Sequence, residues 1–540
     1  MFITSSVPAI GFTNEKKIII DVEINDLNLL NQGDWIENQR LLASDGSTND
    51  LFGISVSIYE DYAIVGSRDD DNQKGSAYIF KRSDKIWYQE AKLTASDGVT
   101  GDWFGISVSI YEDFAFVGAD ADDNIYGLNA GAIYVFKRNG TSWIEQVKLT
   151  ASDGASDSYF GRSVSIFGDY AIVGAYYVDN KTGSAYVFKF TGGNWVEEDK
   201  LIASDGEAGD YFGITISIEE NYALVGAYRE DNSNGVDAGS AYVFKQNGTN
   251  WTEEAKIIAS DGSDEDRFGI EVSMSKGFAI IGAYYDDSYT GSAYIFKIID
   301  DYWVEVDKLT ASDGGINKFF GRSVSIYDDY AIIGAWGNNS QTGSAYIFKF
   351  TGTNWIEYQN LIASDGKNGD RFAYQVDING DYTIIGSYMA DNENGLDAGL
   401  AYIFKNTLPN LICDGSLSWV DVKPGKKVYG NFKIINDGVP GSLLDWEITE
   451  KPAWGIWTIS PEMGKNLTPE ASPFTIDLAV IAPDDPKTEF MGEIKVVNSN
   501  DPSDYCIVPI YLKTPVNRPL SKLLVLNVIL RLRQRSLFFL

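Results

Sequence analysis

A heptad in which bulky apolar residues alternate with small ones recurs seven times between residues 52 and 378. It reads FGISVSI at Phe52 and Phe104, FGRSVSI at Phe160 and Phe320, FGITISI at Phe212, FGIEVSM at Phe268 and FAYQVDI at Phe372. Because successive side chains of a strand point to opposite faces, this alternation predicts a β-strand with one bulky and one small face. The small face lets a neighbouring strand approach closely, so we expect the heptad to form the innermost strand of a repeated sheet.

Three more apolar segments follow each heptad, as in DYAIVGAYY, GSAYVFKF and NWVEEDKLIASDG of the third unit. All are short, rich in β-branched and aromatic residues, and bounded by turn residues, which is typical of strands. Four strands in each of seven units predict an all-β fold with a seven-bladed β-propeller over residues 33–405. The Trp-bearing segment first occurs at Trp35, before the first heptad, and no copy follows the seventh unit. The N-terminal strand is therefore expected to complete blade seven and to close the ring.

The residues at the strand ends resemble a known family. Phe-Gly at the start of one strand, followed by Val-Gly-Ala at the end of the next, as at Val117–Ala119, resembles the FG-GAP repeat of integrin α-subunit propellers and of many prokaryotic surface proteins. The segments GSAYVFK and LTASDG resemble its microbial branch. The resemblance implies an extracellular or cell-surface protein that binds ligands through one loop face. The calcium loop of integrin-type repeats is not expected here, because the connection between the first two strands is only YEDYA or FGDYA.

The chain changes character after the last repeat. Residues 410–515 alternate apolar and polar segments with turns between them, which predicts about seven strands and an immunoglobulin-like β-sandwich. Cys413, placed before the first of these strands, and Cys506, in the last, are the two cysteines of the chain. They either form one disulfide or are buried thiols.

Both ends of the chain leave alternatives open. Residues 1–32 contain ITSSVPAIGF, which resembles the end of a signal peptide but lacks the usual basic start. Residues 516–540 form a basic amphipathic segment, interpreted as a membrane or cell-wall attachment, a helix packed on the body or a disordered end.

Composition narrows the function. The formal net charge of -34 argues against nucleic acid and anionic membranes as partners of the main body. The absence of histidine excludes histidine-based catalysis and histidine metal ligands. The sequence has no run of 18 apolar residues, so no transmembrane helix is expected.

Positions that break the sevenfold symmetry are the candidates for ligand binding. The aspartate of each SDG segment recurs in every unit and is interpreted as structural, because one ligand does not need sevenfold identity. Arg162 and Arg322 appear in only two heptads and are expected on the channel wall, either paired with the SDG carboxylates or forming an anion site. The aromatic residues after Gly-Ala or Gly-Ser are expected either to bind sugar rings or a protein, or to pack between neighbouring loops. These are Tyr176, Tyr228, Tyr284, Trp336 and Tyr388.

Two loop features complete the candidate site. Blades two, four and seven have loops four residues longer, which would expose Leu128, Val236 and Leu396 at their tips for protein contact. Weak candidate ligands for Ca²⁺ lie in the acidic loops of blades one and two, where solvated acidic turns are the alternative. They are Asp69, Asp71, Asp120 and Asp122.

Together these patterns predict a non-enzymatic, secreted or cell-surface adhesion protein that recognises a protein or glycan through the propeller loops. No cofactor is expected beyond weakly bound Ca²⁺. Catalysis is disfavoured because no unit carries a distinctive pair of acidic residues. The alternatives are a glycan-active enzyme built on a propeller and a structural surface-layer scaffold.

Overall fold

The computed structural model describes residues 35–83, 86–407, 409–438, 442–500 and 504–515. The predictions for residues 1–32 and 516–540 lie outside the described residues. Within the described ranges, no helix is both long and apolar enough to cross a membrane.

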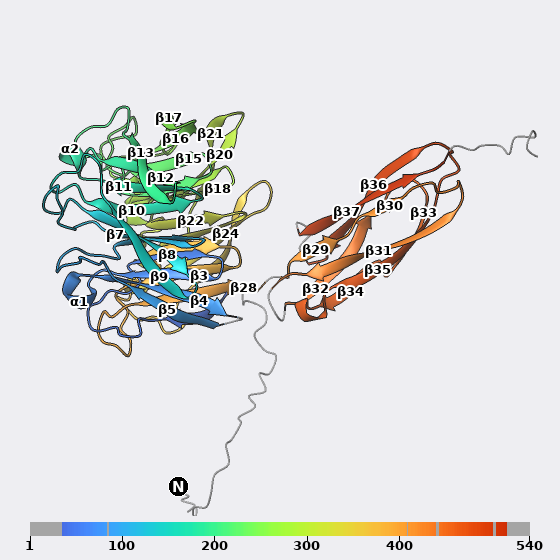
Figure 1. Ribbon diagram of the computed structural model, residues 1–540, viewed down its shortest axis with the longest axis horizontal. Helices are drawn as coiled ribbons and strands as arrows, with labels where there is room; N and C mark the ends of the chain where they lie inside the picture. Colours follow the sequence, from blue (N-terminus) through green and yellow to red (C-terminus); the bar gives the residue numbers. More distant parts are fainter. Residues whose placement is uncertain (1–34, 84–85, 408, 439–441, 501–503, 516–540) are drawn as a thin grey trace, which may run out of the picture. The chain divides into compact units, whose positions relative to one another are not determined.

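Seven four-stranded antiparallel sheets form the repeat region, as predicted (Figure 1). Blade one contains β2 (Ser55–Tyr59), β3 (Tyr62–Ser67), β4 (Ser76–Ser83) and β5 (Ile86–Leu93), and blade two contains β6 (Ser107–Tyr111), β7 (Phe114–Ala119), β8 (Ala132–Asn139) and β9 (Ser142–Leu149). Blade three contains β10 (Phe160–Phe167), β11 (Tyr170–Ala175), β12 (Ser184–Thr191) and β13 (Asn194–Leu201), and blade four contains β14 (Ile216–Glu219), β15 (Tyr222–Ala227), β16 (Ser240–Asn247) and β17 (Asn250–Ile257). Blade five contains β18 (Phe268–Ser275), β19 (Phe278–Ala283), β20 (Ser292–Ile299) and β21 (Tyr302–Leu309), and blade six contains β22 (Ser323–Tyr327), β23 (Tyr330–Ala335), β24 (Ser344–Phe350) and β25 (Trp355–Leu361). Blade seven contains β26 (Gln375–Asn379), β27 (Tyr382–Ser387), β28 (Leu400–Asn406) and β1 (Trp35–Leu41).

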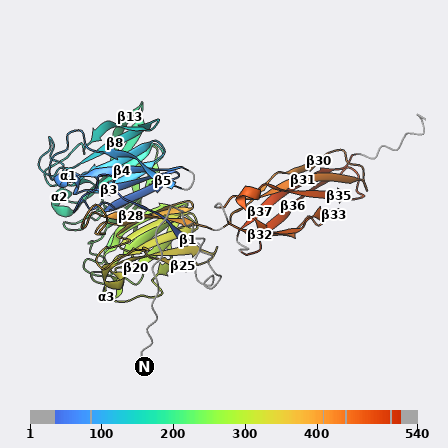
Figure 2. The ribbon, with the colours of Figure 1, turned by 90° about the horizontal axis from the view of Figure 1, so that it is seen from below.

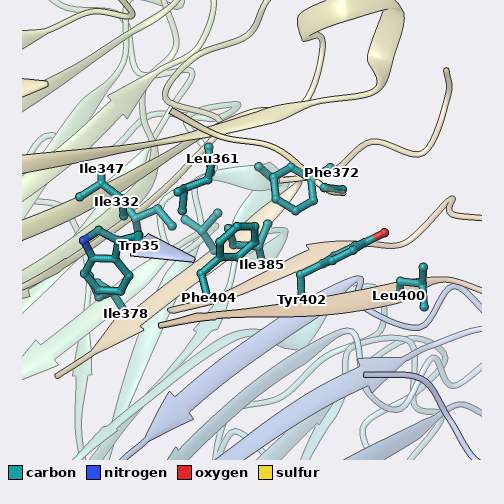
Figure 3. Packing of buried hydrophobic residues seen from close by; sticks show 14 of the residues in the cluster. Trp35, Ile332, Ile347, Leu361, Phe372, Ile378, Ile385, Leu400, Tyr402 and Phe404 are labelled. Carbon is teal, nitrogen blue, oxygen red and sulfur yellow. The ribbon is translucent and has the colours of Figure 1, made fainter. Parts of the chain in front are cut away.

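The first described strand closes the ring, which confirms the prediction for the Trp35 segment. β1 pairs antiparallel with β28, from Trp35 opposite Asn406 to Leu41 opposite Ala401. Trp35 is 1% exposed and lies in a cluster of buried hydrophobic side chains (Figure 3). Its ring packs edge-on against Tyr330 of the neighbouring blade at 5.6 Å. The other six outer-strand tryptophans pack in the same way against an aromatic ring of the preceding blade. β1 therefore replaces the missing outer strand of blade seven in packing as well as in pairing.

The small face of the heptad brings neighbouring blades into direct contact. A Cβ added to Gly118 would lie 2.1 Å from the carbonyl oxygen of Gly161 in the next blade, so no larger residue fits there. Ser107 Oγ donates a hydrogen bond to the same carbonyl at 2.8 Å. The second serine of a heptad accepts a hydrogen bond from a backbone amide of the next blade, as Ser165 does from Ile218 N–H at 3.2 Å. The serines are thus cross-blade hydrogen-bonding groups as well as small residues.

The connections between second and third strands take two forms. Blades one, three and five have the short helical turns α1 (Asp70–Gln73), α2 (Val178–Lys181) and α3 (Asp286–Tyr289) (Figure 2). Blade six has a fourth, α4 (Asn338–Gln341). Blades two, four and seven have the longer loops, each closed by a short bridge such as that between Asn124 and Gly127. Their apolar tips, Leu128, Val236 and Leu396, are 66%, 60% and 64% exposed, as the sequence predicted.

Two further sheets form a β-sandwich between residues 411 and 513. One contains β29 (Leu411–Asp414), β31 (Lys427–Asn436), β35 (Phe474–Ile481) and β33 (Ile456–Ser460). The other contains β30 (Leu417–Trp419), β37 (Tyr505–Lys513), β36 (Glu489–Asn498), β32 (Leu444–Glu450) and β34 (Met463–Leu467), and a 3₁₀ turn, η1 (Pro469–Ala471), precedes β35. Both sheets contribute to one core around Phe432, Trp446 and Ile494. The described residues between 411 and 513 contain nine strands rather than the predicted seven or so, because β29 and β30 are too short to show clear alternation. The immunoglobulin-like assignment stays a prediction.

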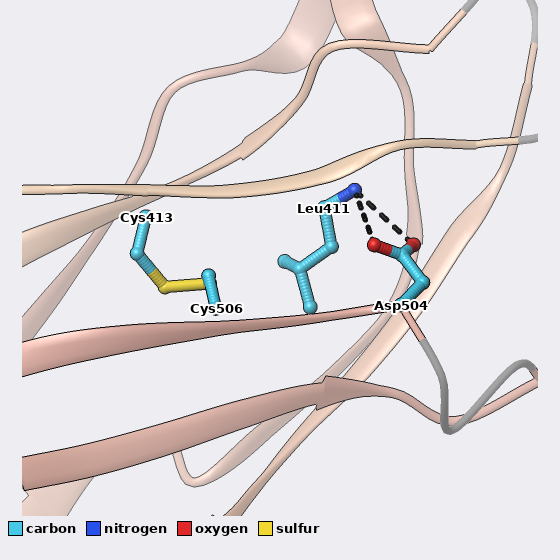
Figure 4. The surroundings of a disulfide bond; sticks show 4 residues. All are labelled: Leu411, Cys413, Asp504 and Cys506. Carbon is cyan, nitrogen blue, oxygen red and sulfur yellow. Dashed lines mark hydrogen bonds between the residues drawn. A yellow bond between two sulfur atoms is a disulfide. The ribbon is translucent and has the colours of Figure 1, made fainter. Parts of the chain in front are cut away.

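The two cysteines form a disulfide, which settles the alternative that the sequence left open (Figure 4). The sequence predicted Cys413 before the first strand, but it lies within β29. Cys506 lies in the last strand, β37, as predicted. The bond therefore joins the two sheets of the sandwich across a Cα–Cα distance of 5.6 Å. Nearby, Leu411 N–H donates to both carboxylate oxygens of Asp504 at 3.2 Å. Because Asp504 directly precedes β37, this hydrogen bond is a second link between β29 and β37.

Candidate functional site

The seven innermost strands surround a polar channel with a cavity of about 400 Å³. The heptads line it because each blade presents its first strand to the axis. Most of the lining is serine and branched apolar side chains repeated from blade to blade. The exceptions, which make the wall asymmetric, are Arg68, Arg162, Thr215, Glu271, Arg322, Tyr374, Gln375 and Asp377, together with Tyr228 and Tyr284.

Arg322 is held by partners on the channel wall. Its Nη2 donates to the Tyr374 hydroxyl at 3.1 Å, and its Nη1 lies 3.8 Å from Glu271 Oε2. Thr215 donates to the other Glu271 oxygen at 2.9 Å. Burial raises the pKa of Glu271, against the opposing effect of Arg322, and the guanidinium lowers the pKa of Tyr374. The expectation that the channel arginines pair with SDG carboxylates is therefore wrong: the partner is Glu271, itself a symmetry-breaking residue.

Arg162 occupies the same heptad position but has different surroundings. Among the described residues its guanidinium makes no hydrogen bond or ion pair, and it lies 5.9 Å from the centre of the Tyr176 ring. Asp120 is a buried electrostatic neighbour. Burial raises the pKa of Asp120 to about 6, which Arg162 and then Arg68 oppose, and its Oδ1 has no hydrogen-bond partner among the described residues. A cation and a partly satisfied carboxyl thus lie near one another without direct pairing.

The SDG aspartates are engaged elsewhere. Asp45 accepts a hydrogen bond from the buried Tyr78 hydroxyl at 3.0 Å and pairs with Lys92 at 2.7 Å. Lys92 also pairs with Asp70 of the neighbouring loop at 2.7 Å. A tyrosine–aspartate hydrogen bond recurs in every blade, at Asp97, Asp153, Asp205, Asp261, Asp313 and Asp365. The contacts agree with a structural role for this position.

The aromatic candidates form an arc at the channel mouth, and each packs against aromatic or arginine side chains of adjacent loops and strands. Tyr228 and Tyr284 line the cavity, whereas Trp336 is stacked on Phe319 at 4.7 Å with Arg371 placed 4.9 Å from its ring centre. Tyr176 contacts Tyr159, Tyr177 and Tyr211, and Tyr388 packs against Tyr374 at 4.6 Å. Of the two alternatives from the sequence, packing between neighbouring loops describes these contacts.

Sequence reasoning missed the residue before the phenylalanine that opens each heptad. These seven residues all adopt left-handed backbone conformations, with φ between 52° and 64°, and they bring bulky side chains into the arc: Leu51, Trp103, Tyr159, Tyr211, Arg267, Phe319 and Arg371. Such a conformation is unfavourable for large side chains. The available signal was variability: this position changes from blade to blade while the Phe that follows it stays constant.

The four aspartates predicted as weak Ca²⁺ ligands lie near lysine, arginine or tyrosine side chains or are exposed. Asp122 pairs with Lys148 at 2.8 Å and accepts from Tyr134 at 2.9 Å, and Asp69 lies 3.5 Å from Arg68. Asp71 is exposed, and Asp120 faces the arginines. Across the described ranges, no group of three or more acidic or cysteine side chains is arranged to hold a metal ion.

Comparison with known proteins finds one family. The sequence model described as the FG-GAP repeat matches seven segments: residues 35–80, 87–136, 143–188, 195–244, 251–296, 303–348 and 355–404. Each match begins at the Trp-bearing strand and ends in the third strand of the following blade, so one sequence unit spans two blades. No curated protein matches the chain.

Proposed function

Since this chain belongs to the FG-GAP repeat family, we propose that it is a secreted or cell-surface binding protein that recognises its ligand through the loop face of the propeller. The family is generally non-catalytic, and its members are typically extracellular or surface-located. The disulfide between Cys413 and Cys506 supports an oxidising compartment for the protein.

One observation carries the proposal: the departures from sevenfold symmetry gather at the same end of the channel. Arg68 follows a second strand, Arg322 precedes a first strand, and the arc of aromatic residues connects the blades between them. Arginine and tyrosine are the residues most enriched at the energetic centres of protein interfaces. The exposed tips Leu128, Val236 and Leu396 extend this face outward with apolar contacts.

A binding screen tests the proposal. The full chain would be immobilised and probed with extracellular protein domains and a glycan array, with and without chelator. We expect at least one ligand whose binding is abolished in the triple variant Leu128→Glu, Val236→Glu and Leu396→Glu, because these tips are exposed and their loss leaves the core intact.

The control is Tyr302→Glu at the start of an outer strand, which is 74% exposed at the other end of the blade. Binding that is lost in this control but kept in the triple variant would place the ligand on the opposite face. A screen that yields no ligand at all would contradict a binding function.

A further inference from the structure

The propeller concentrates its arginines at the channel mouth. Between residues 33 and 405 the sequence contains nine arginines, in a chain with a net charge of -34. Six of them line the cavity or contact the rings of the aromatic arc: Arg68, Arg162, Arg229, Arg267, Arg322 and Arg371. A guanidinium cluster at the axis of an acidic protein creates a local positive potential inside a negative surface.

The arginines differ in how far the protein itself satisfies them. Arg267 pairs with Asp237 at 3.1 Å, and Arg322 is held by Glu271 and Tyr374. The guanidinium of Arg162 has neither a hydrogen bond nor an ion pair within the part of the chain that the structure describes, although it lines the cavity. Its planar group of five donors is available to a ligand, and carboxylates match that geometry with two parallel hydrogen bonds.

The cavity limits what can enter. About 400 Å³ accommodates a side chain or a chain end with some water, and lies at the small end of ligand pockets. Its wall offers further polar groups within the same space, including Thr215, Tyr374 and Gln375. A single charged group on an extended segment fits these dimensions, whereas a folded surface does not.

The surroundings favour a peptide over a sugar as the carrier of that group. Stacked sugar rings need a free aromatic face, but Trp336 already contacts the Phe319 ring and the Arg371 guanidinium. The apolar tips Leu128 and Val236 on the same loop face instead suit the hydrophobic side chains of a protein segment.

We propose that the channel mouth binds the carboxylate of an acidic peptide segment, with Arg162 as the anchoring cation and Arg322 as a fixed part of the wall. This inference rests on the proposed binding function and names its ligand class. Glu271 serves to hold Arg322 in place. The identical heptads therefore have different tasks: one arginine stabilises the wall, and the other is left for the ligand.

Fluorescence anisotropy with defined probes tests the inference on the full chain. The probes are fluorescein-labelled decaglutamate, a decaglutamine peptide as the uncharged match, and oligogalacturonate as a carboxylate-bearing glycan. We expect saturable binding of decaglutamate that weakens with added salt, no binding of decaglutamine, and at least a tenfold loss of decaglutamate affinity in Arg162→Gln.

The matched control is Arg138→Gln, which changes the net charge equally but alters an arginine paired with Asp113 away from the cavity. We expect less than a twofold effect there. Three results would each overturn the inference. They are an equal loss of affinity in both variants, an unchanged affinity in Arg162→Gln, and no binding of decaglutamate to the unmodified protein. Preference for oligogalacturonate would overturn the peptide assignment.

The outcome is separable from that of the binding screen. If the screen finds a loop-face ligand that Arg162→Gln binds normally, the binding function stands and the channel inference fails. If neither the screen nor the probes show binding, both fail.

Discussion

The ring of SDG aspartates and the channel mouth are both rich in charge, but the two regions satisfy that charge differently. Around the ring, Asp261 accepts from the Tyr294 hydroxyl and pairs with Lys308, which also pairs with Asp286. At the mouth, the Arg322 guanidinium has a hydrogen bond and an ion pair, while that of Arg162, in an identical heptad, has neither among the described residues. A charge repeated in every blade is matched by repeated partners, whereas a charge present in one or two blades depends on other exceptions.

From this difference we infer that residues repeated in every blade stabilise the fold, whereas residues found in only one or two blades can serve recognition. Single changes at repeated positions should therefore lower the free energy of unfolding strongly. Changes at the unpaired exception should affect binding with little effect on folding.

Ring closure should be the most sensitive repeated feature. Trp35→Ala removes a side chain that is 1% exposed and packs against Tyr330. We expect a loss of about 3–5 kcal/mol in the free energy of unfolding, the usual cost of deleting a large buried aromatic side chain. Calorimetry of the full chain measures the change. A loss below about 1 kcal/mol would mean that β1 is dispensable for the closed ring.

The SDG network should come next. Asp261→Ala leaves the buried Tyr294 hydroxyl with only the longer contact of 3.3 Å to Asp286, and removes one partner of Lys308. We expect destabilisation of about 2 kcal/mol, because a buried donor loses its main acceptor. Glu393→Ala, which removes an exposed carboxylate, is the control and should change stability by less than about 0.5 kcal/mol. Equal effects of the two variants would contradict the structural role.

Replacing Asp377 should raise the free energy of unfolding, by less than the two substitutions above lower it. The other six heptads have serine at this position. Asp377 accepts the Ile58 amide at 2.8 Å, the cross-blade contact that serine makes elsewhere. Burial raises the pKa of Asp377 to about 6, above the value of about 4 for an unfolded aspartate. The folded protein therefore binds more protons between these values, and stability falls as pH rises from about 4 through 6.

Asp377→Ser removes this dependence. We expect a gain on the order of 1 kcal/mol at pH 8, reduced by the water that reaches the channel wall, and no gain at pH 4. Urea denaturation at both pH values measures the difference. A gain that is the same at pH 4 and pH 8 would show that titration of this carboxyl is not its origin.

The repeated sequence made the fold predictable. The positions that depart from the repeat identified candidate site residues but not their contacts. Seven copies of the heptad, six of them opening with Phe-Gly, predicted the blades, and the position of Trp35 predicted the closing strand. The exceptions at Arg162 and Arg322 were visible in the sequence. Their partners were not, because Glu271 reaches Arg322 across the boundary between blades five and six, and the sequence pattern does not show which side chains meet there. The sandwich was predicted less accurately, since β29 and β30 span only 4 and 3 residues.

The comparison of Arg322→Ala with Arg162→Ala tests the central claim most directly. Urea denaturation of the two variants beside the unmodified protein measures the free energies of unfolding. Arg322→Ala leaves Glu271 buried without its cation and should cost about 1–3 kcal/mol. Arg162→Ala breaks no direct hydrogen bond or ion pair among the described residues and should stay within about 0.5 kcal/mol of the unmodified protein. Equal destabilisation by both substitutions would contradict the assignment of one arginine to the wall and the other to the ligand.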